Sequence, residues 1–164
     1  VYGIQNEPNG IDYGLFIAED YIGDDNCVLF LGDNIFVDDI APAIRNFKKG
    51  ATVFLKKVPD PKRFGIAEVD SKGKIISLEE KPQKPKGDLA VTGLYIYDNS
   101  VFDKIRRIPP SARGEYEITS VNALYLAEGA LHSHMLKKEW FDIGNIEALH
   151  KASVFMEKRS LHDK

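Results

Sequence analysis

Short apolar runs alternate with helix-spaced apolar positions along the chain, and this pattern predicts an α/β domain with a mixed sheet. The run 27–31 lies between Gly23 and Gly32 and is too short for a helix, so it predicts a buried parallel strand. Residues 89–97 are apolar almost throughout and predict a longer strand. Further strands are predicted at 51–55 and 131–136, and a hairpin joins 65–69 to 74–78.

Helical spacing and capping residues predict four helices between these strands. They cover 12–21, the segment from the cap at Asp38 and Asp39 to the stop at Gly50, 115–127, and 146–158 after the cap Asn145. The last helix is expected to turn one apolar face inward, made of Ile146, Leu149, Ala152, Val154 and Phe155.

Composition narrows the class of protein. The chain has 164 residues, 43% of them hydrophobic and 29% charged, which fits one globular domain over 1–164. Its net charge of −3 argues against a nucleic-acid partner. The single cysteine, Cys27, cannot form an internal disulfide, and no run approaches 18 apolar residues. We therefore expect a cytoplasmic protein with no membrane partner.

Two aspartates follow apolar segments and stand beside glycines. Asp33 ends the phrase LGD after the strand at 27–31, and Asp142 lies in the phrase WFDIGN before the last helix. Ligands of open α/β sheets collect at the carboxyl ends of strands, and carboxylates from two such loops suit Mg²⁺. The alternatives are a turn role for Asp33 and a helix cap for Asp142, although Asn145 is better placed as that cap.

A second charged pair, Glu80 and Lys81, ends the hairpin. Strand alternation places Ile76, Leu78 and Glu80 on one face, so the Glu80 carboxylate is expected to point inward. A carboxylate beside an ammonium group can hold a sugar hydroxyl and a phosphate. The alternative is an exposed salt pair at the end of a strand.

Three further positions can approach a ligand. Gly65 opens a predicted strand and Gly93 lies inside one, where either a ligand or a neighbouring side chain fills the space beside the backbone. Arg113 lies in a charged loop that opens the helix at 115–127, which is also a normal helix N-terminus.

Together these motifs resemble the bacterial sugar-1-phosphate nucleotidyltransferases, and within them the glucose-1-phosphate thymidylyltransferases. The matching phrases occur in family order along nearly the whole chain. They are Gln5 with Pro8 and Gly10, then 31–36, 63–65, 79–82, 91–95, 98–100, 113–115 and 140–144.

The resemblance implies a Rossmann-like, glycosyltransferase-A-like three-layer sandwich with a mixed sheet. It also implies a reaction in which glucose 1-phosphate attacks dTTP with Mg²⁺, giving dTDP-glucose for dTDP-rhamnose and surface polysaccharides, in a homo-oligomer that is a tetramer in the family. By this resemblance Asp33 and Asp142 are the catalytic, metal-binding residues. The implied substrate-binding residues are Gln5 and Gly10 for the base, Gly65, Glu80, Lys81 and Val91 for glucose 1-phosphate, and Arg113 for a phosphate.

The chain also departs from the family pattern. It contains no G-G-x-G-T-R loop and starts without an initiator methionine, so we expect a C-terminal, sugar-phosphate- and metal-binding portion that lacks the N-terminal nucleotide-binding segment and is inactive alone. Phe64 replaces a usual tyrosine, and residues 11–14, IDYG, replace Leu-Ala-Gln-Ala. Two alternatives stay open: a UTP- or CTP-dependent transferase, and a non-catalytic binding or assembly module.

Overall fold

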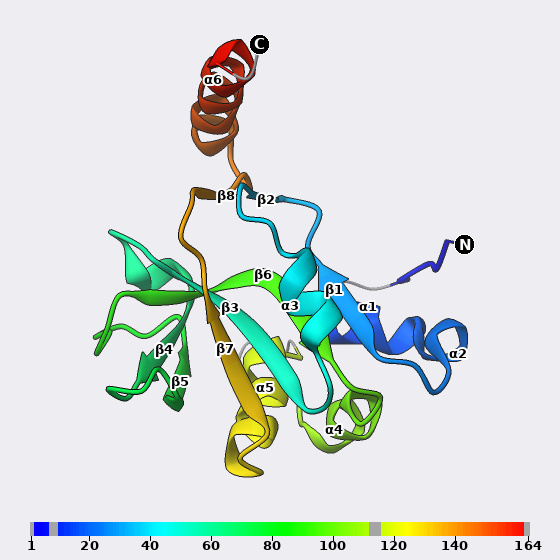
Figure 1. Cartoon of the computed structure of the whole chain (residues 1–164). Helices are drawn as coiled ribbons and strands as arrows, with labels where there is room; N and C mark the ends of the chain where they lie inside the picture. Colours follow the sequence, from blue (N-terminus) through cyan, green and yellow to red (C-terminus); the bar gives the residue numbers. More distant parts are fainter. Residues whose placement is uncertain (1, 7–9, 112–115, 163–164) are drawn as a thin grey trace.

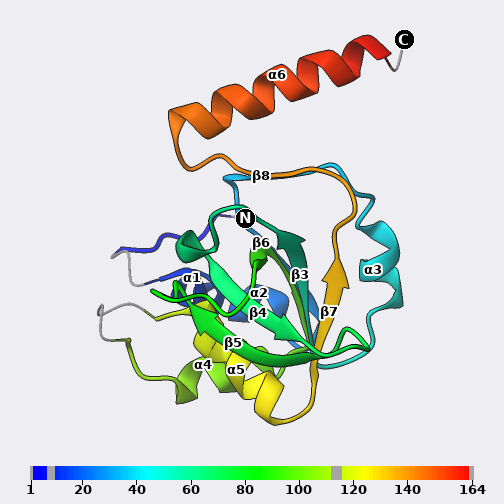
Figure 2. The same cartoon turned by 90° about the vertical axis from the view of Figure 1, so that its left-hand side faces the viewer.

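A computed structural model describes residues 2–6, 10–111 and 116–162 of the chain and shows helices on both faces of a mixed β-sheet (Figures 1 and 2). The helices are α1 (Ile11–Ile17), α2 (Glu19–Ile22), α3 (Ala41–Asn46), the 3-10 turn η1 (Pro61–Arg63), α4 (Val101–Arg107), α5 (Ile118–Ala127) and α6 (Ile146–His162). The strands are β1 (Cys27–Phe30), β2 (Asn34–Phe36), β3 (Ala51–Lys57), β4 (Gly65–Val69), β5 (Ile75–Glu80), β6 (Leu89–Tyr97), β7 (Leu131–Met135) and β8 (Trp140–Asp142).

Strand β6 lies at the centre of the main sheet, whose order is β5-β4-β6-β3-β7. Its first residues pair with β4, and its last four pair with β1. Strands β3 and β7 are parallel, and the other pairs in this sheet are antiparallel. The predicted hairpin is present as β4 and β5, and the predicted strand at 89–97 has the bounds of β6.

Two apolar layers hold the helices against the sheet. On one face, residues of α1, α4 and α5 pack with β3 and β6, and the largest of them include Phe102 and Tyr125. On the other face, Phe54, Leu94 and Ile96 pack against apolar residues in and around α3. This three-layer arrangement confirms the predicted α/β class with a mixed sheet, although α4, with its buried Val101, Phe102 and Ile105, was not among the predicted helices.

The prediction that 27–31 forms a buried parallel strand is wrong. Strand β1 runs antiparallel to β6, and its burial alternates along the chain. Cys27 is 9% exposed, whereas Val28 and Phe30 are 41% and 47% exposed. In the described part of the chain β1 pairs with β6 alone, so its other edge is unpaired there. The face that carries Val28 and Phe30 is only partly covered, with Phe30 packed against Phe36.

Asp98 fixes the end of β6 to its neighbours. This residue is 8% exposed, and its carboxylate accepts hydrogen bonds from Gly50 N (2.7 Å), Ser100 Oγ (2.5 Å) and Tyr125 OH (2.9 Å). Burial alone raises the pKa of Asp98, but the hydrogen bonds from Ser100, Gly50 and Tyr125 outweigh it and hold that pKa below the ordinary 3.8. The charged carboxylate therefore stabilises the junction of β6, β3 and α5.

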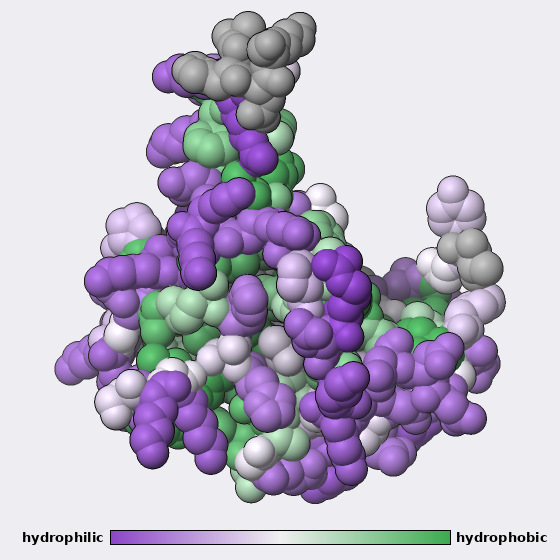
Figure 3. Space-filling view, in the orientation of Figure 1, coloured by the Kyte–Doolittle hydropathy of each residue, from purple (hydrophilic) through white to green (hydrophobic). Residues whose placement is uncertain are grey.

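The last helix starts as predicted and buries the predicted face only in part, since Val154 and Phe155 are half-buried and Phe155 packs against Phe141. The Asn145 side chain accepts a hydrogen bond from Ala148 N at 2.9 Å, as expected of a cap. Ala152 is buried, but Ile146 and Leu149 are 86% and 47% exposed. Helix α6 projects from the sheet, and apolar surface continues along it (Figures 1 and 3). None of the helices in the described ranges has the length and apolar character that crossing a membrane requires.

Candidate functional site

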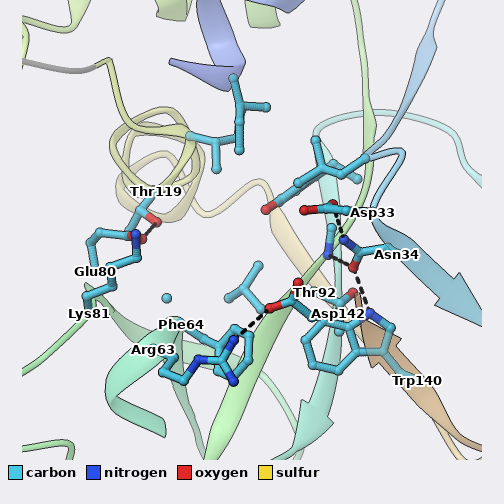
Figure 4. Close-up of a pocket in the computed structure, with 17 residues that line it drawn as sticks. Asp33, Asn34, Arg63, Phe64, Glu80, Lys81, Thr92, Thr119, Trp140 and Asp142 are labelled. Carbon is cyan, nitrogen blue, oxygen red and sulfur yellow. Dashed lines mark hydrogen bonds and ion pairs between the residues drawn. The ribbon is translucent and has the colours of Figure 1, made fainter. Parts of the chain in front are cut away.

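A cavity of about 250 Å³ opens where the ends of β1 and β5, the start of β4 and the middle of β6 meet the first turn of α5 (Figure 4). Its walls bring together residues from distant parts of the sequence, including six of the nine predicted site residues. Those from the predicted set are Asp33, Gly65, Glu80, Lys81, Val91 and Asp142.

Strands β2 and β8 form a two-stranded ribbon that brings the two aspartates together. In the antiparallel register of this ribbon Asn34 lies opposite Asp142, and Ile143 N donates a hydrogen bond to the carbonyl oxygen of Asp33 at 2.7 Å. A Cβ atom added to Gly144 would lie 3.3 Å from Asp142 Oδ1 and 3.7 Å from Asp33 Oδ2. One position beside Gly144 is therefore within reach of an oxygen from each carboxylate.

This pair of carboxylates fits a hard divalent cation. No cluster of three or more His, Cys, Asp or Glu side chains suited to a metal occurs among the described residues. Two carboxylates with water or phosphate oxygens in the remaining positions match the ligands of Mg²⁺, which keeps several waters and binds substrate phosphates. Arg63 contacts the same site, since its guanidinium lies 3.6 Å from Asp142 Oδ2, but its side chain is half exposed.

Sequence reasoning missed Asn34, which joins the aspartate wall to the main sheet. Its side chain is bonded to Asp33, Gly93 and Trp140 (Figure 4). The only sequence signal was Gly93, because a glycine inside a buried strand indicates that something lies against it. That neighbour is Asn34: a Cβ atom at Gly93 would lie 2.6 Å from the Asn34 side chain. Of the two explanations offered for Gly93, a ligand or a neighbouring side chain beside the backbone, the structure shows the neighbouring side chain.

The opposite wall carries Glu80 and Lys81. The Glu80 Oε2 atom accepts a hydrogen bond from Thr119 Oγ1 at 2.5 Å, and Lys81 Nζ lies 3.9 Å from Glu80 Oε1. Adjacent residues of a regular strand point to opposite faces, yet both line the cavity. The left-handed backbone of Lys81 (φ 41°) ends the alternation and accounts for this arrangement. Ile76, predicted on the inward face with Glu80, is instead 60% exposed.

Gly65 and Tyr95 complete this wall. A Cβ atom at Gly65 would lie 3.1 Å from Glu80 Oε2 and 3.2 Å from Thr119 Oγ1, so glycine leaves room for that hydrogen-bonded pair. Burial raises the pKa of the Tyr95 hydroxyl, and the negative charge of Glu80 raises it further. Tyr95 therefore remains a neutral hydrogen-bonding group beside the cavity.

Two of the predicted substrate contacts lie outside this cavity, and a third lies outside the described residues. Gln5 Nε2 donates a hydrogen bond to Gly10 O at 3.3 Å, and Gln5 lines a separate hollow with Gly14 and Tyr21. Gly10 forms an isolated bridge with Tyr116, and the next residue along the chain, Ile11, lines the main cavity. The described structure thus does not bring Gln5 and Gly10 into the cavity, and Arg113 belongs to the part of the chain that it does not describe.

Comparisons with known proteins identify the family of this chain. A family model described as nucleotidyl transferase matches residues 1–159. The chain is 42% identical, over 95% of its length, to glucose-1-phosphate thymidylyltransferase of Neisseria meningitidis, and 44% identical, over 94%, to the protein of that name from Mycolicibacterium smegmatis. It spans 56% of the length of each of these relatives.

Solved structures share the fold. A Bacillus anthracis protein that is named as a glucose-1-phosphate thymidylyltransferase, in complex with a sucrose, matches with a TM-score of 0.87 and 45% identity. The match covers 94% of this chain and 64% of that chain. A UDP-glucose pyrophosphorylase complexed with UDP-glucose matches with a TM-score of 0.83 and 20% identity, which is a likeness of fold alone; the match covers 94% of this chain and 64% of that chain.

Proposed function

This chain belongs to the nucleotidyl transferase family, and we propose that it serves the transfer of a nucleotidyl group from dTTP to glucose 1-phosphate, which gives dTDP-glucose and pyrophosphate. The observation that carries the proposal is a cavity with two facing aspartates on one wall and a glutamate–lysine pair on the other. In this proposal the chain forms the sugar-phosphate- and metal-binding part of the transferase domain.

The aspartate wall has the chemistry of a phosphate-bridging metal site. Asp33 and Asp142 are the residues that would hold Mg²⁺, and the bound ion would supply neutralisation of the phosphate charge. Transfer at phosphorus depends mostly on such neutralisation and on the positioning of the two reactants. The carboxylates flank one position beside Gly144, which supports this role.

The opposite wall provides the contacts that a sugar phosphate needs. The Lys81 ammonium pairs with the phosphate, and Glu80 accepts hydrogen bonds from sugar hydroxyls while Thr119 holds its carboxylate in place. Gly65 and Val91 line the same wall and shape the space for the sugar. Gln5 and Gly10 are our proposed contacts for the pyrimidine base, and Arg113 is our proposed contact for a phosphate.

The metal assignment is tested by electron paramagnetic resonance with Mn²⁺, a spectroscopic substitute for Mg²⁺. We expect the chain to bind Mn²⁺ and expect Asp33→Asn and Asp142→Asn each to weaken that binding at least tenfold, since each removes one carboxylate ligand. Asp25→Asn, in a loop away from the cavity, is the control and leaves the affinity unchanged. Mn²⁺ binding that survives both cavity substitutions would overturn the assignment.

The sugar-phosphate assignment is tested by titration calorimetry with glucose 1-phosphate and with dTTP. A charge-assisted phosphate contact is worth about 1.5–3 kcal/mol. Lys81→Ala should therefore weaken the binding of glucose 1-phosphate by about ten- to a hundredfold and the binding of dTTP far less. Lys72→Ala, in the exposed turn of the same hairpin, is the matched control. Equal losses for the two ligands, or tighter binding of UTP or CTP than of dTTP, would contradict the substrates proposed here.

A further inference from the structure

We propose that Asn34 is a positioning residue, which fixes the Asp33 carboxylate and ties the ribbon of β2 and β8 to strand β6. This inference rests on the proposed function, because it gives Asn34 a role toward the cation that Asp33 and Asp142 would hold. Asn34 is only 8% exposed, so its amide group is removed from most competing water.

The three hydrogen bonds of the Asn34 side chain determine which way its amide faces. The Oδ1 atom accepts from Gly93 N at 3.0 Å and from Trp140 Nε1 at 2.7 Å. Both of these partners are donors only, so the oxygen of the amide has to face them. The Nδ2 group is then directed at Asp33 Oδ1, to which it donates at 2.8 Å.

The contact with Gly93 continues the pairing of β1 with β6 after β1 has ended. The ladder runs from Cys27 opposite Tyr97 to Phe30 opposite Leu94, and Leu31 N then donates to Gly93 O at 2.9 Å. The Gly93 N–H has the Asn34 side chain as its acceptor. A side chain thus takes the place of a strand partner at the point where the chain turns away from the main sheet.

Gly93 leaves the space that this arrangement needs. A Cβ atom there would lie 2.6 Å from Asn34 Cγ and Nδ2 and 2.7 Å from its Oδ1. Any side chain at this position would displace the amide, and the hydrogen bond to Asp33 would be lost with it. Gly93 and Asn34 therefore act as one unit, although neither carries charge.

Asn34 also reaches the strand that carries the second aspartate. Trp140 lies on β8 two residues before Asp142, and Asn34 is opposite Asp142 in the register of the ribbon. One amide thus contacts Asp33 directly and holds the β8 strand on the other side. Carboxylates that are already oriented lose less side-chain freedom when a cation binds, so the arrangement favours binding.

The test compares two affinities in the native chain and three variants. Mn²⁺ affinity is measured by electron paramagnetic resonance, and glucose 1-phosphate affinity by calorimetry, because the second ligand contacts the opposite wall. Asn34→Ala removes the amide, and Gly93→Ala displaces it without changing any polar side chain. Tyr97→Phe is the control, since it removes another buried hydrogen bond of β6, from Tyr97 OH to Asn122 Oδ1 at 2.8 Å, away from the cavity.

We expect Asn34→Ala and Gly93→Ala each to weaken Mn²⁺ binding by about 10- to 100-fold, as is usual when a partner of a metal ligand is removed. Glucose 1-phosphate affinity should change less than about threefold, and Tyr97→Phe should change neither affinity. Equal losses for both ligands, or unchanged Mn²⁺ affinity in Asn34→Ala, would overturn the inference and leave the proposed function standing. A native chain that binds no Mn²⁺ would overturn the metal assignment and this inference with it.

Discussion

Replacing Asp12 by alanine should stabilise the protein at alkaline pH, although the substitution lies in its interior. Asp12 is in the first turn of α1 and is 0% exposed. Its Oδ1 accepts a hydrogen bond from Tyr13 N at 3.1 Å, but its Oδ2 has no hydrogen-bond partner in the described structure. Burial, with a smaller contribution from the negative charge of Glu117, raises the pKa of this carboxyl from 3.8 to about 6.

The size of the effect follows from the difference in pKa between the two states. The folded protein holds the proton of Asp12 more tightly than the unfolded chain, so this group favours folding below pH 3.8 and loses that contribution as the pH rises through about 6. One pKa unit corresponds to about 1.36 kcal/mol, so the buried charge costs about 3 kcal/mol above pH 7. Asp12→Ala removes this cost, and the small loss of packing offsets part of the gain.

The measurement is urea unfolding of the native chain and Asp12→Ala at pH 4 and pH 8, followed by the fluorescence of Trp140, the single tryptophan. The free energy of unfolding of the variant, relative to the native chain, should be higher by about 2–3 kcal/mol at pH 8 than at pH 4. Asp20→Ala, an exposed aspartate of α2, is the comparison. A difference that stays the same at the two pH values, or a loss of stability at pH 8, would refute an uncompensated buried carboxylate.

Three further predictions concern other contacts. Asp98→Asn should lower the free energy of unfolding by about 1–3 kcal/mol at pH 7, and since the pKa of Asp98 is lowered on folding, the loss should shrink in acid titrations that pass below 3.8. Gly50→Ala places a Cβ atom 2.3 Å from a backbone oxygen, at a residue whose φ is 85°. Its melting temperature should fall more than that of Gly23→Ala, where φ is 59° and the space is open, and equal falls would contradict the clash. Thr119→Val removes the hydrogen bond to Glu80 and should weaken the binding of glucose 1-phosphate about tenfold in calorimetry without changing the melting temperature. An unchanged affinity would show that Glu80 does not need the Thr119 hydrogen bond to bind the sugar.

The sequence predicted elements well where the signal is local and poorly where it depends on distant pairing. The hairpin of β4 and β5 was predicted from its own turn, and β6 from its long apolar run. The apolar run at 27–31 predicts a buried parallel strand, but such a run does not indicate whether other elements cover both faces of the strand. The burial of Val28 and Phe30 depends on what packs against β1 from elsewhere, which no pattern within residues 27–31 contains.

The same limit separates the residues of the site that could be predicted from those that could not. Asp33, Glu80 and Asp142 stand beside glycine, proline or strand-end signals, so each was visible as a candidate from its neighbours alone. Asn34 gave no such signal, because its importance comes from partners that lie far away in the sequence, in β6 and β8. The ribbon of β2 and β8 has only three residues in each strand, too few for a periodic pattern.

The backbone irregularity at Lys81 places two adjacent charged side chains at the same cavity. A regular β5 would direct Glu80 and Lys81 to opposite faces of the sheet, and only one of the two charges could then reach a ligand. The left-handed conformation of Lys81, with φ 41°, brings both to the cavity, while its N–H stays bonded to Phe64 O at 3.1 Å. Such a conformation costs a non-glycine residue about 1–2 kcal/mol and persists only where the surroundings enforce it. Backbone strain at one residue and an amide buried at Asn34 thus perform the same task on opposite walls, since each holds a charged group of the cavity in place before any ligand arrives.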